Sequence, residues 1–268
     1  MLAGPKPRIF TFLSATTEDE NGAMLVNLSA SLARAGSDVL LLDAHLSSRG
    51  VASRLEASGA ATLMEVARQE RALNEVIQTL PQGFGMAMLA RGANRCMPQD
   101  AAQVRRLANT FGMLAKQADI VVVDAQLDED DGFPIAAMAS GEIVVQVSTR
   151  AASIKSAYGL VKRLNARLGR RPFSILVTGA TDEEACLIYE NMAKAASRYL
   201  AVRLNSMGSV PADEHVKRAA RLGRAVVDAF PMAGASVAFR RLAGQFSMAD
   251  QPAVGARGLS AGGTNFGS

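Results

Sequence analysis

Two short aliphatic runs, each ending in aspartate, constrain the fold of this chain more than any other feature. They are DVLLLD at Asp38–Asp43 and DIVVVD at Asp119–Asp124. A strand with one solvent-exposed face alternates apolar and polar residues, whereas a strand buried on both faces is apolar throughout. Both runs therefore predict central strands of a parallel sheet that helices cover on each side.

Strand and helix patterns alternate along most of the remaining chain. Further strands are expected at Arg8–Leu13, Gly85–Leu89, Glu142–Val147, Pro172–Thr178 and Arg203–Val210, and helices at Gly22–Ala35, Gln99–Lys116, Ala151–Leu168, Glu183–Leu200, after Asp213, and at Gly234–Phe246. This order predicts an α/β fold, a single doubly wound domain over residues 1–246 with a mostly parallel sheet flanked by helices. Residues 247–268 are rich in Gly, Ala and Ser and predict a disordered tail.

Composition excludes several classes of protein. Of 268 residues, 49% are hydrophobic, which is enough to build a core. The aliphatic runs are far shorter than the roughly 20 residues of a membrane span, and the chain does not open with a secretory signal pattern. Cys96 and Cys186 lie too far apart for a C-x-x-C pair, so neither a disulfide framework nor a zinc site is expected. These features favour a cytoplasmic protein.

Three segments together resemble a known family. They are IFTFLSATTEDENGAMLVNLSASLARAGSDVLLLDAHL at 9–46, DIVVVDAQ at 119–126, and LNSMGSVPADEHVKRAARLGRAVVDAFP at 204–231. In this order they resemble the MinD/ParA group of P-loop ATPases. ASIKSAYGLVKRL at 152–164, followed by FSILVTGA at 173–180, is similar to the flagellar-number regulators of that group, called FlhG or FleN. The resemblance covers about residues 8–246 and implies a P-loop NTPase fold.

The family's phosphate-binding loop is glycine-rich, holds two lysines and ends in Lys-Thr. The resemblance aligns it with ATTEDENG at Ala15–Gly22. The matching positions are Thr16 for the first lysine, Asn21 for the last lysine, Gly22 for the threonine that coordinates Mg²⁺, and Thr17, Glu18 and Glu20 for glycines. The resemblance therefore indicates a degenerate Walker A loop.

Charge and backbone freedom both oppose a phosphate in this loop. Glycines let a P-loop turn consecutive N–H groups inward, and lysine then neutralises the phosphates. In this chain the loop has no lysine and carries the acids Glu18, Asp19 and Glu20. A carboxylate and a phosphate about 4 Å apart repel by about 1 kcal/mol in water and about 4 kcal/mol at an effective dielectric of 20. The spacing of Thr17 and Glu20 also matches a helix capping box, with the three acids in the first helical turn.

Other positions of the family's nucleotide site are altered or have a second interpretation. The family's Asp-x-Asp is Asp43-Ala44-His45 here, and the asparagine that recognises adenine is Thr178. Asp124 and Asp213 persist, although Asp213 is equally suited to cap a helix. We therefore interpret Thr16, Asn21, Gly22, Asp43, His45, Asp124, Thr178 and Asp213 as remnants of a nucleotide site, with no catalytic residue, no metal ligand and no bound ATP or Mg²⁺ expected.

A second acidic segment, Asp128–Asp131, follows the strand at 119–124. Because neighbouring parallel strands end at one edge, these acids are expected near the loop at 15–22 and near Asp43. They predict an acidic rim that binds a basic partner segment: Glu18, Asp19, Glu20, Asp128, Glu129, Asp130 and Asp131, beside Asp43 and Asp124. The alternative is a set of solvated loop acids. Basic residues of the late helices are interpreted as solvated faces, with nonspecific DNA binding as the alternative.

The resulting hypothesis is a cytosolic regulator of flagellar biosynthesis that acts by protein–protein interaction and is a pseudo-ATPase. The resemblance implies a flagellar SRP-type GTPase, a flagellar transcriptional activator or a basal-body protein as partner, and a homodimer. Nothing in the sequence indicates specific nucleic-acid binding or a membrane-binding helix. The alternatives are a divergent active ParA/MinD-like ATPase for positioning, with a cation from Arg49 or a partner subunit, and a MinD-like localisation factor for pilus or cellulose secretion.

Overall fold

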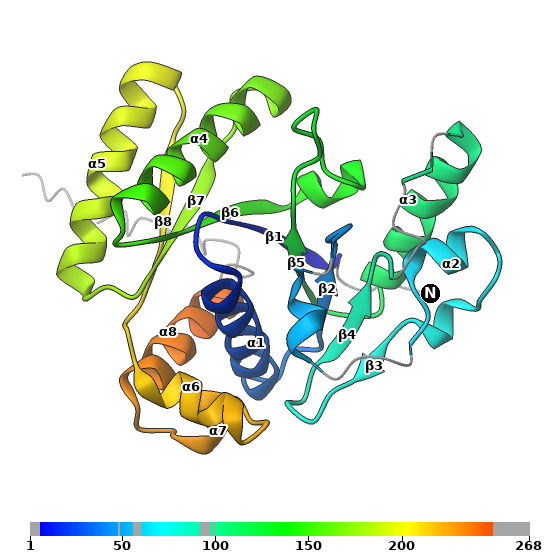
Figure 1. Ribbon diagram of the computed structural model, residues 1–268, viewed down its shortest axis with the longest axis horizontal. Coiled ribbons are helices and arrows are strands. Elements are labelled where there is room, and N and C mark those ends of the chain that lie inside the picture. Colours follow the sequence, from blue (N-terminus) through cyan, green and yellow to red (C-terminus); the bar gives the residue numbers. More distant parts are fainter. Residues whose placement is uncertain (1–5, 48, 56–59, 92–96, 99, 249–268) are drawn as a thin grey trace, which may run out of the picture.

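The computed structural model describes residues 6–47, 49–55, 60–91, 97–98 and 100–248 (Figure 1). In this part of the chain eight strands form one sheet in the order β3-β4-β2-β5-β1-β6-β7-β8. The strands are β1 Arg8–Ser14, β2 Val39–Asp43, β3 Gln78–Thr79, β4 Gly85–Met88, β5 Ile120–Ala125, β6 Glu142–Ser148, β7 Phe173–Thr178 and β8 Leu204–Val210. All neighbouring pairs are parallel except β3 with β4.

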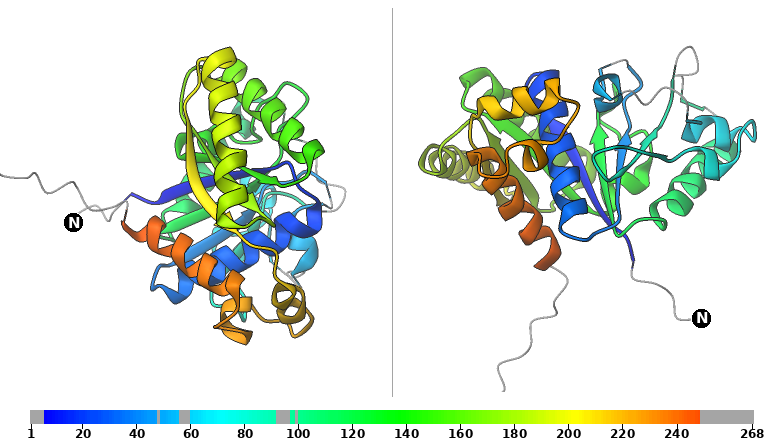
Figure 2. Two further views of the ribbon diagram at one scale, coloured as in Figure 1. Left: turned by 90° about the vertical axis from the view of Figure 1, so that its left-hand side faces the viewer. Right: turned by 90° about the horizontal axis from the view of Figure 1, so that it is seen from below.

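Helices cover both faces of the sheet (Figure 2). The α-helices are α1 Glu18–Arg34, α2 Leu63–Ala67, α3 Ala101–Ala115, α4 Ala151–Leu168, α5 Asp182–Leu200, α6 Glu214–Arg221, α7 Val226–Ala229 and α8 Gly234–Met248, and the 3₁₀ helices are η1 Val51–Arg54, η2 Leu73–Glu75 and η3 Ala136–Ser140. The core on one face joins α1, α6, α7 and α8, and the core on the other joins α2, α3, α4 and α5. The predicted doubly wound α/β domain is confirmed.

The two aliphatic runs are central strands, as predicted. Every residue of β2 and of β5 is buried. The strands pair in parallel, and their register sets Asp43 directly beside Asp124 at the carboxyl edge of the sheet. The most constraining feature of the sequence therefore also determines where two carboxylates meet.

Several boundaries differ from the sequence prediction. Helix α1 begins at Glu18, not at Gly22, because Thr17 and Glu20 form the capping box and so stabilise an earlier first turn. The short elements β3, α2 and α7 were not predicted, since two to five residues are too few to show a period. Helix α8 continues to Met248, past the predicted domain boundary at 246, and residues 249–268 of the predicted tail lie outside the described residues.

The start of β1 lies against the end of α8. The Phe10 and Phe246 rings are in contact with centroids 4.2 Å apart and planes tilted by 43°, and the Arg8 guanidinium donates to the carbonyl oxygen of Phe246. Both contacts lie near the amino end of β1, so they are at the opposite edge of the sheet from Asp43 and Asp124. Within the described residues, no helix combines the length and the apolar character needed to cross a membrane.

Candidate functional site

A buried polar network lies where β2 and β5 end. Asp124 is 1% exposed, and its Oδ1 accepts a hydrogen bond from Asn21 Nδ2 at 2.9 Å and lies 3.1 Å from His45 Nε2. Its Oδ2 accepts from the backbone N–H of Val51 at 2.8 Å. Three of the predicted site residues, Asn21, His45 and Asp124, therefore meet in one network.

Asp43, at the end of β2, binds backbone amides of the segment that follows β2, as Asp124 binds the amide of Val51. Its carboxylate accepts from the backbone N–H of His45 at 3.0 Å and of Ala52 at 2.9 Å. Gly50 packs so closely on this carboxylate that a Cβ there would overlap it. The segment 44–54, of which residue 48 is outside the described residues, is thus folded over the two buried aspartates.

Burial and charge in this network raise the pKa values of Asp43 and His45. Burial raises the pKa of the Asp43 carboxyl, and the negative charge of Asp124 raises it further. Burial alone would lower the pKa of His45, but its hydrogen bond with Asp124 and the charges of Asp124 and Asp43 outweigh burial and raise it. The shift favours the protonated form of His45, whose positive charge would face Asp124.

Backbone amides at the start of α1 are bound within the protein itself. Five of the seven N–H groups from Ala15 to Asn21 donate to an acceptor within the chain. Ala15 donates to Gln146 O at 2.9 Å, Thr16 to Ser14 Oγ at 3.0 Å, Thr17 to Glu20 Oε2 at 3.2 Å, Glu20 to Thr17 Oγ1 at 3.3 Å and Asn21 to Thr17 O at 3.0 Å. The alternative interpretation of Thr17 and Glu20 as a capping box is confirmed.

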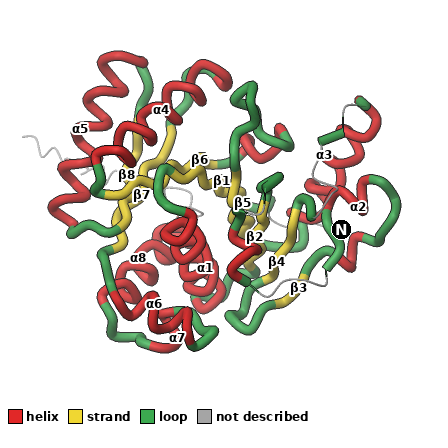
Figure 3. The backbone as a smooth tube through the Cα atoms, in the orientation of Figure 1, coloured by secondary structure: helices red, strands yellow, loops and turns green. Residues whose placement is uncertain are grey.

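Each of the three acids in the first turn of α1 forms an ion pair with an arginine from another segment. Glu18 pairs with Arg49 at 3.5 Å, Asp19 with Arg54, and Glu20 with Arg150 at 2.7 Å. Arg54 belongs to η1, which packs beside α1 (Figure 3), and Arg150 precedes α4. The first-turn acids are thus matched by cations that the sequence places far away.

Two of the other acids of the predicted rim, Asp128 and Asp131, have partners within the chain. Asp128 Oδ1 accepts from the backbone N–H of Asp130 at 3.0 Å and of Gly132 at 2.7 Å, and Asp131 pairs with Arg163 of α4 at 2.9 Å. Glu129 and Asp130 are exposed. Across the described residues, His, Cys, Asp and Glu side chains form no group of three or more suited to a metal ion.

Thr178 and Asp213 lie at the ends of β7 and β8. Thr178 Oγ1 lies 3.4 Å from both Gln146 Nε2 and the carbonyl oxygen of Val147. Asp213 caps two helices, because it accepts from His215 N–H in α6 at 2.9 Å and from Ala235 N–H in α8 at 3.0 Å. Burial opposes these bonds, yet together they lower the pKa of Asp213. The predicted capping role of Asp213 is confirmed.

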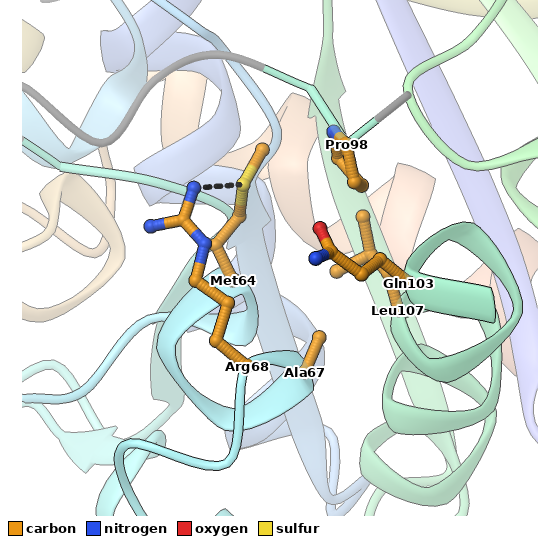
Figure 4. A pocket seen from close by; sticks show the side chains of 6 residues that line it. All are labelled: Met64, Ala67, Arg68, Pro98, Gln103 and Leu107. Carbon is orange, nitrogen blue, oxygen red and sulfur yellow. Dashed lines mark hydrogen bonds between the residues drawn. The ribbon is translucent and has the colours of Figure 1, made fainter. Parts of the chain in front are cut away.

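Sequence reasoning missed Arg54, Arg150 and Gln146. Each reaches the start of α1 from a distant segment, so no local pattern marks them. A separate shallow hollow lies between α2 and α3 (Figure 4) and contains none of the predicted site residues. It is lined by Met64, Ala67, Arg68, Pro98, Gln103 and Leu107.

The fold is that of the α/β domains of the MinD/ParA class. MinD from Pyrococcus horikoshii, solved with Mg-ADP, matches with a TM-score of 0.67 and 18% identity over 91% of this chain and 97% of its own. The ParA family ATPase from Chlorobium tepidum matches with a TM-score of 0.66 and 15% identity over 89% and 98%. No family model matches the sequence.

A curated relative narrows the class. The antiactivator FleN of Pseudomonas aeruginosa is 32% identical over 219 residues, which are 81% of this chain and 78% of that protein. The chain therefore belongs to the FleN family of MinD/ParA-type proteins.

Proposed function

We propose that this chain regulates flagellar biosynthesis as an antiactivator, by binding protein partners and without using ATP. The observation that supports ATP independence most directly is at the α1 start, where five backbone amides and three carboxylates already have partners within the chain. Kinship with an antiactivator supports the flagellar context.

Electrostatics supports the loss of nucleotide binding. A triphosphate at the start of α1 would face Glu18, Asp19 and Glu20 and would have to displace Glu20 from the Thr17 amide. Repulsion between like charges about 4 Å apart is about 4 kcal/mol per pair at an effective dielectric of 20, and the lost internal bonds add to it. Arg49, Arg54 and Arg150 are already paired and so are only partly available to an incoming phosphate.

Cytoplasmic protein partners follow from the same proposal. By family resemblance they are a flagellar transcriptional activator, a flagellar SRP-type GTPase or a basal-body protein, and a second copy of the chain can take part as a homodimer. Glu129 and Asp130 are exposed, so a basic segment of a partner can contact them without breaking a buried interaction.

The first experiment is calorimetric titration of the purified chain with Mg-ATP and Mg-ADP to millimolar concentration, with circular dichroism to show that the protein is folded. We expect no binding. A Kd near micromolar, which corresponds to a binding free energy of about −8 kcal/mol, would overturn the nucleotide-independent mechanism.

A loop-restoration variant tests the cause. Replacing Thr16 and Asn21 by Lys, Thr17, Glu18 and Glu20 by Gly, and Gly22 by Thr should create measurable affinity for Mg-ADP if the α1 start is the defect. The matched control neutralises the similar acidic turn of α5, as Asp182→Asn, Glu183→Gln and Glu184→Gln, and should bind no nucleotide. Failure of the restored loop to bind would show that other parts of the site also prevent binding.

Complementation tests the biological role. The wild-type chain, expressed in Pseudomonas aeruginosa lacking FleN, should restore the flagellar number counted by electron microscopy. A chain that is expressed and folded but leaves the number unchanged would contradict the antiactivator role.

A divergent active ATPase remains the second candidate, because Asp43 and Asp124 persist at the strand ends and Arg49 supplies a nearby cation. It requires ATP turnover by the wild-type chain that disappears in Asp124→Ala. Absence of turnover in the wild type excludes it.

A further inference from the structure

Gly22 occupies an unusual place for a glycine. It is buried within α1, where glycine is the least favourable residue after proline. A Cβ at this position would overlap the Arg54 side chain, approaching Nε to 2.5 Å and Cδ more closely. The absence of a side chain at residue 22 therefore leaves the space through which Arg54 passes.

Arg54 joins two parts of the site. Its guanidinium donates to the carboxylate of Asp19, and this bond lowers the pKa of Asp19. On the other side, η1 is fixed by the N–H groups of Val51 and Ala52, which donate to the two buried aspartates. Residues 49–54 are thus attached to the sheet edge through Val51 and Ala52 and to α1 through Arg54.

We propose that Arg54, Gly22 and Asp19 form a latch that keeps residues 49–54 closed over the buried aspartates. The latch rests on the proposed function, because a site that needs no nucleotide can stay closed. An exposed ion pair contributes little by itself. Here it matters because Arg54 closely follows the backbone amides of Val51 and Ala52, which donate hydrogen bonds to Asp124 and Asp43.

A double-mutant cycle tests whether Arg54 lies across Gly22 in solution. Gly22→Ala in an Arg54→Ala background should raise the unfolding midpoint by about 2–4 °C, because alanine favours the helix. The same change in the wild-type background should give no gain or a loss, because the new Cβ must displace Arg54. An equal gain in both backgrounds would overturn the latch.

Gly112 in α3 provides the matched control. A Cβ there would meet no other atom within 4 Å, so Gly112→Ala should give the same gain with and without Arg54. A gain at Gly112 that also depended on Arg54 would show that the cycle does not report a local contact, and the double-mutant result would then count against the proposal.

Amide hydrogen exchange tests closure. Exchange of the Val51 and Ala52 amides should quicken severalfold in Arg54→Ala but not in Arg49→Ala, which removes the neighbouring exposed arginine. Unchanged exchange in Arg54→Ala would refute the latch. Both tests use the protein without nucleotide, so Mg-ADP binding by the wild-type chain would overturn the proposed function alone.

Discussion

Helices α1 and α5 begin with nearly the same sequence. Thr17–Glu20 reads TEDE and Thr181–Glu184 reads TDEE, and each motif follows a parallel strand. Both threonines cap their helix, both motifs close a capping box, and both first turns hold three acids. Up to this point the two helix starts are equivalent.

Their surroundings differ. Each first-turn acid of α1 meets an arginine from another segment, and α1 contributes Asn21 to the buried aspartate network. At α5, Asp182 accepts from Arg241 and from Ser209, which ties α5 to α8 and β8. An acidic capping box is therefore an ordinary way to begin a helix, and only the distant segments around it make the α1 start a candidate site.

The largest expected difference between the two regions is in how much the free energy of unfolding falls when an aspartate is removed. Asp124→Ala should lower the free energy of unfolding by about 3 kcal/mol, because buried donors of Asn21 and Val51 lose their acceptor. Asp182→Ala, at an exposed position, should lower the free energy of unfolding much less. Urea unfolding measures both, and equal costs would remove the distinction.

A pH dependence should be specific to the α1 region. The folded-state pKa of His45 is raised above its usual 6.5, so its stabilising proton is fully bound below that value and is lost as pH rises through the folded pKa. The free energy of unfolding should therefore fall as pH rises from about 6.5 through the folded-state pKa of His45, by at most about 1.4 kcal/mol per pH unit. Urea melts should show this fall in the wild type and in His215→Gln but not in His45→Gln.

Removing the caps should affect the two helices equally. Thr17→Ala and Thr181→Ala each lose one side-chain bond to a helix amide, which costs about 1 kcal/mol. Thermal unfolding of both variants tests this equivalence. A much larger cost at Thr17 would mean that the capping threonine also supports the arginine pairs.

The smallest effect on stability is expected at low pH, from the Asp182 carboxylate at the start of α5. Hydrogen bonds from Arg241 and Ser209 lower the pKa of Asp182 to about 2. A lowered acid pKa stabilises the fold above the ordinary value of 3.8, and that contribution is lost as pH falls towards 2. Arg241→Ala should raise the pKa of Asp182 towards 3.8, as NMR titration of its carboxyl carbon can measure. An unchanged pKa would show that Arg241 does not hold this carboxylate in solution.

Much of the fold follows from local patterns. The bounds of α4 match the prediction, and β2 and β5 begin one residue after the predicted starts, because helical period and continuous burial are encoded within each segment. The strand β3 could not be predicted, since its two residues become a strand only by pairing with β4.

The site was predictable only in part. The capping box, the capping role of Asp213 and the position of Asp43 and Asp124 at one sheet edge follow from spacing and from parallel topology. The bond from Asn21 to Asp124 and the ion pair of Arg150 with Glu20 span more than 100 residues each, so they depend on the completed fold. Absence of nucleotide binding stays a prediction until the titration is done.

The contact of Phe246 with Phe10 has a practical consequence for labelling. It brings residues near the two ends of the described chain together at the amino edge of the sheet, whereas Asp43, Asp124 and the start of α1 lie at the carboxyl edge. A fluorophore attached beside either residue would therefore be separated from the latch by the length of the strands. Reporters placed there would not obstruct the proposed latch.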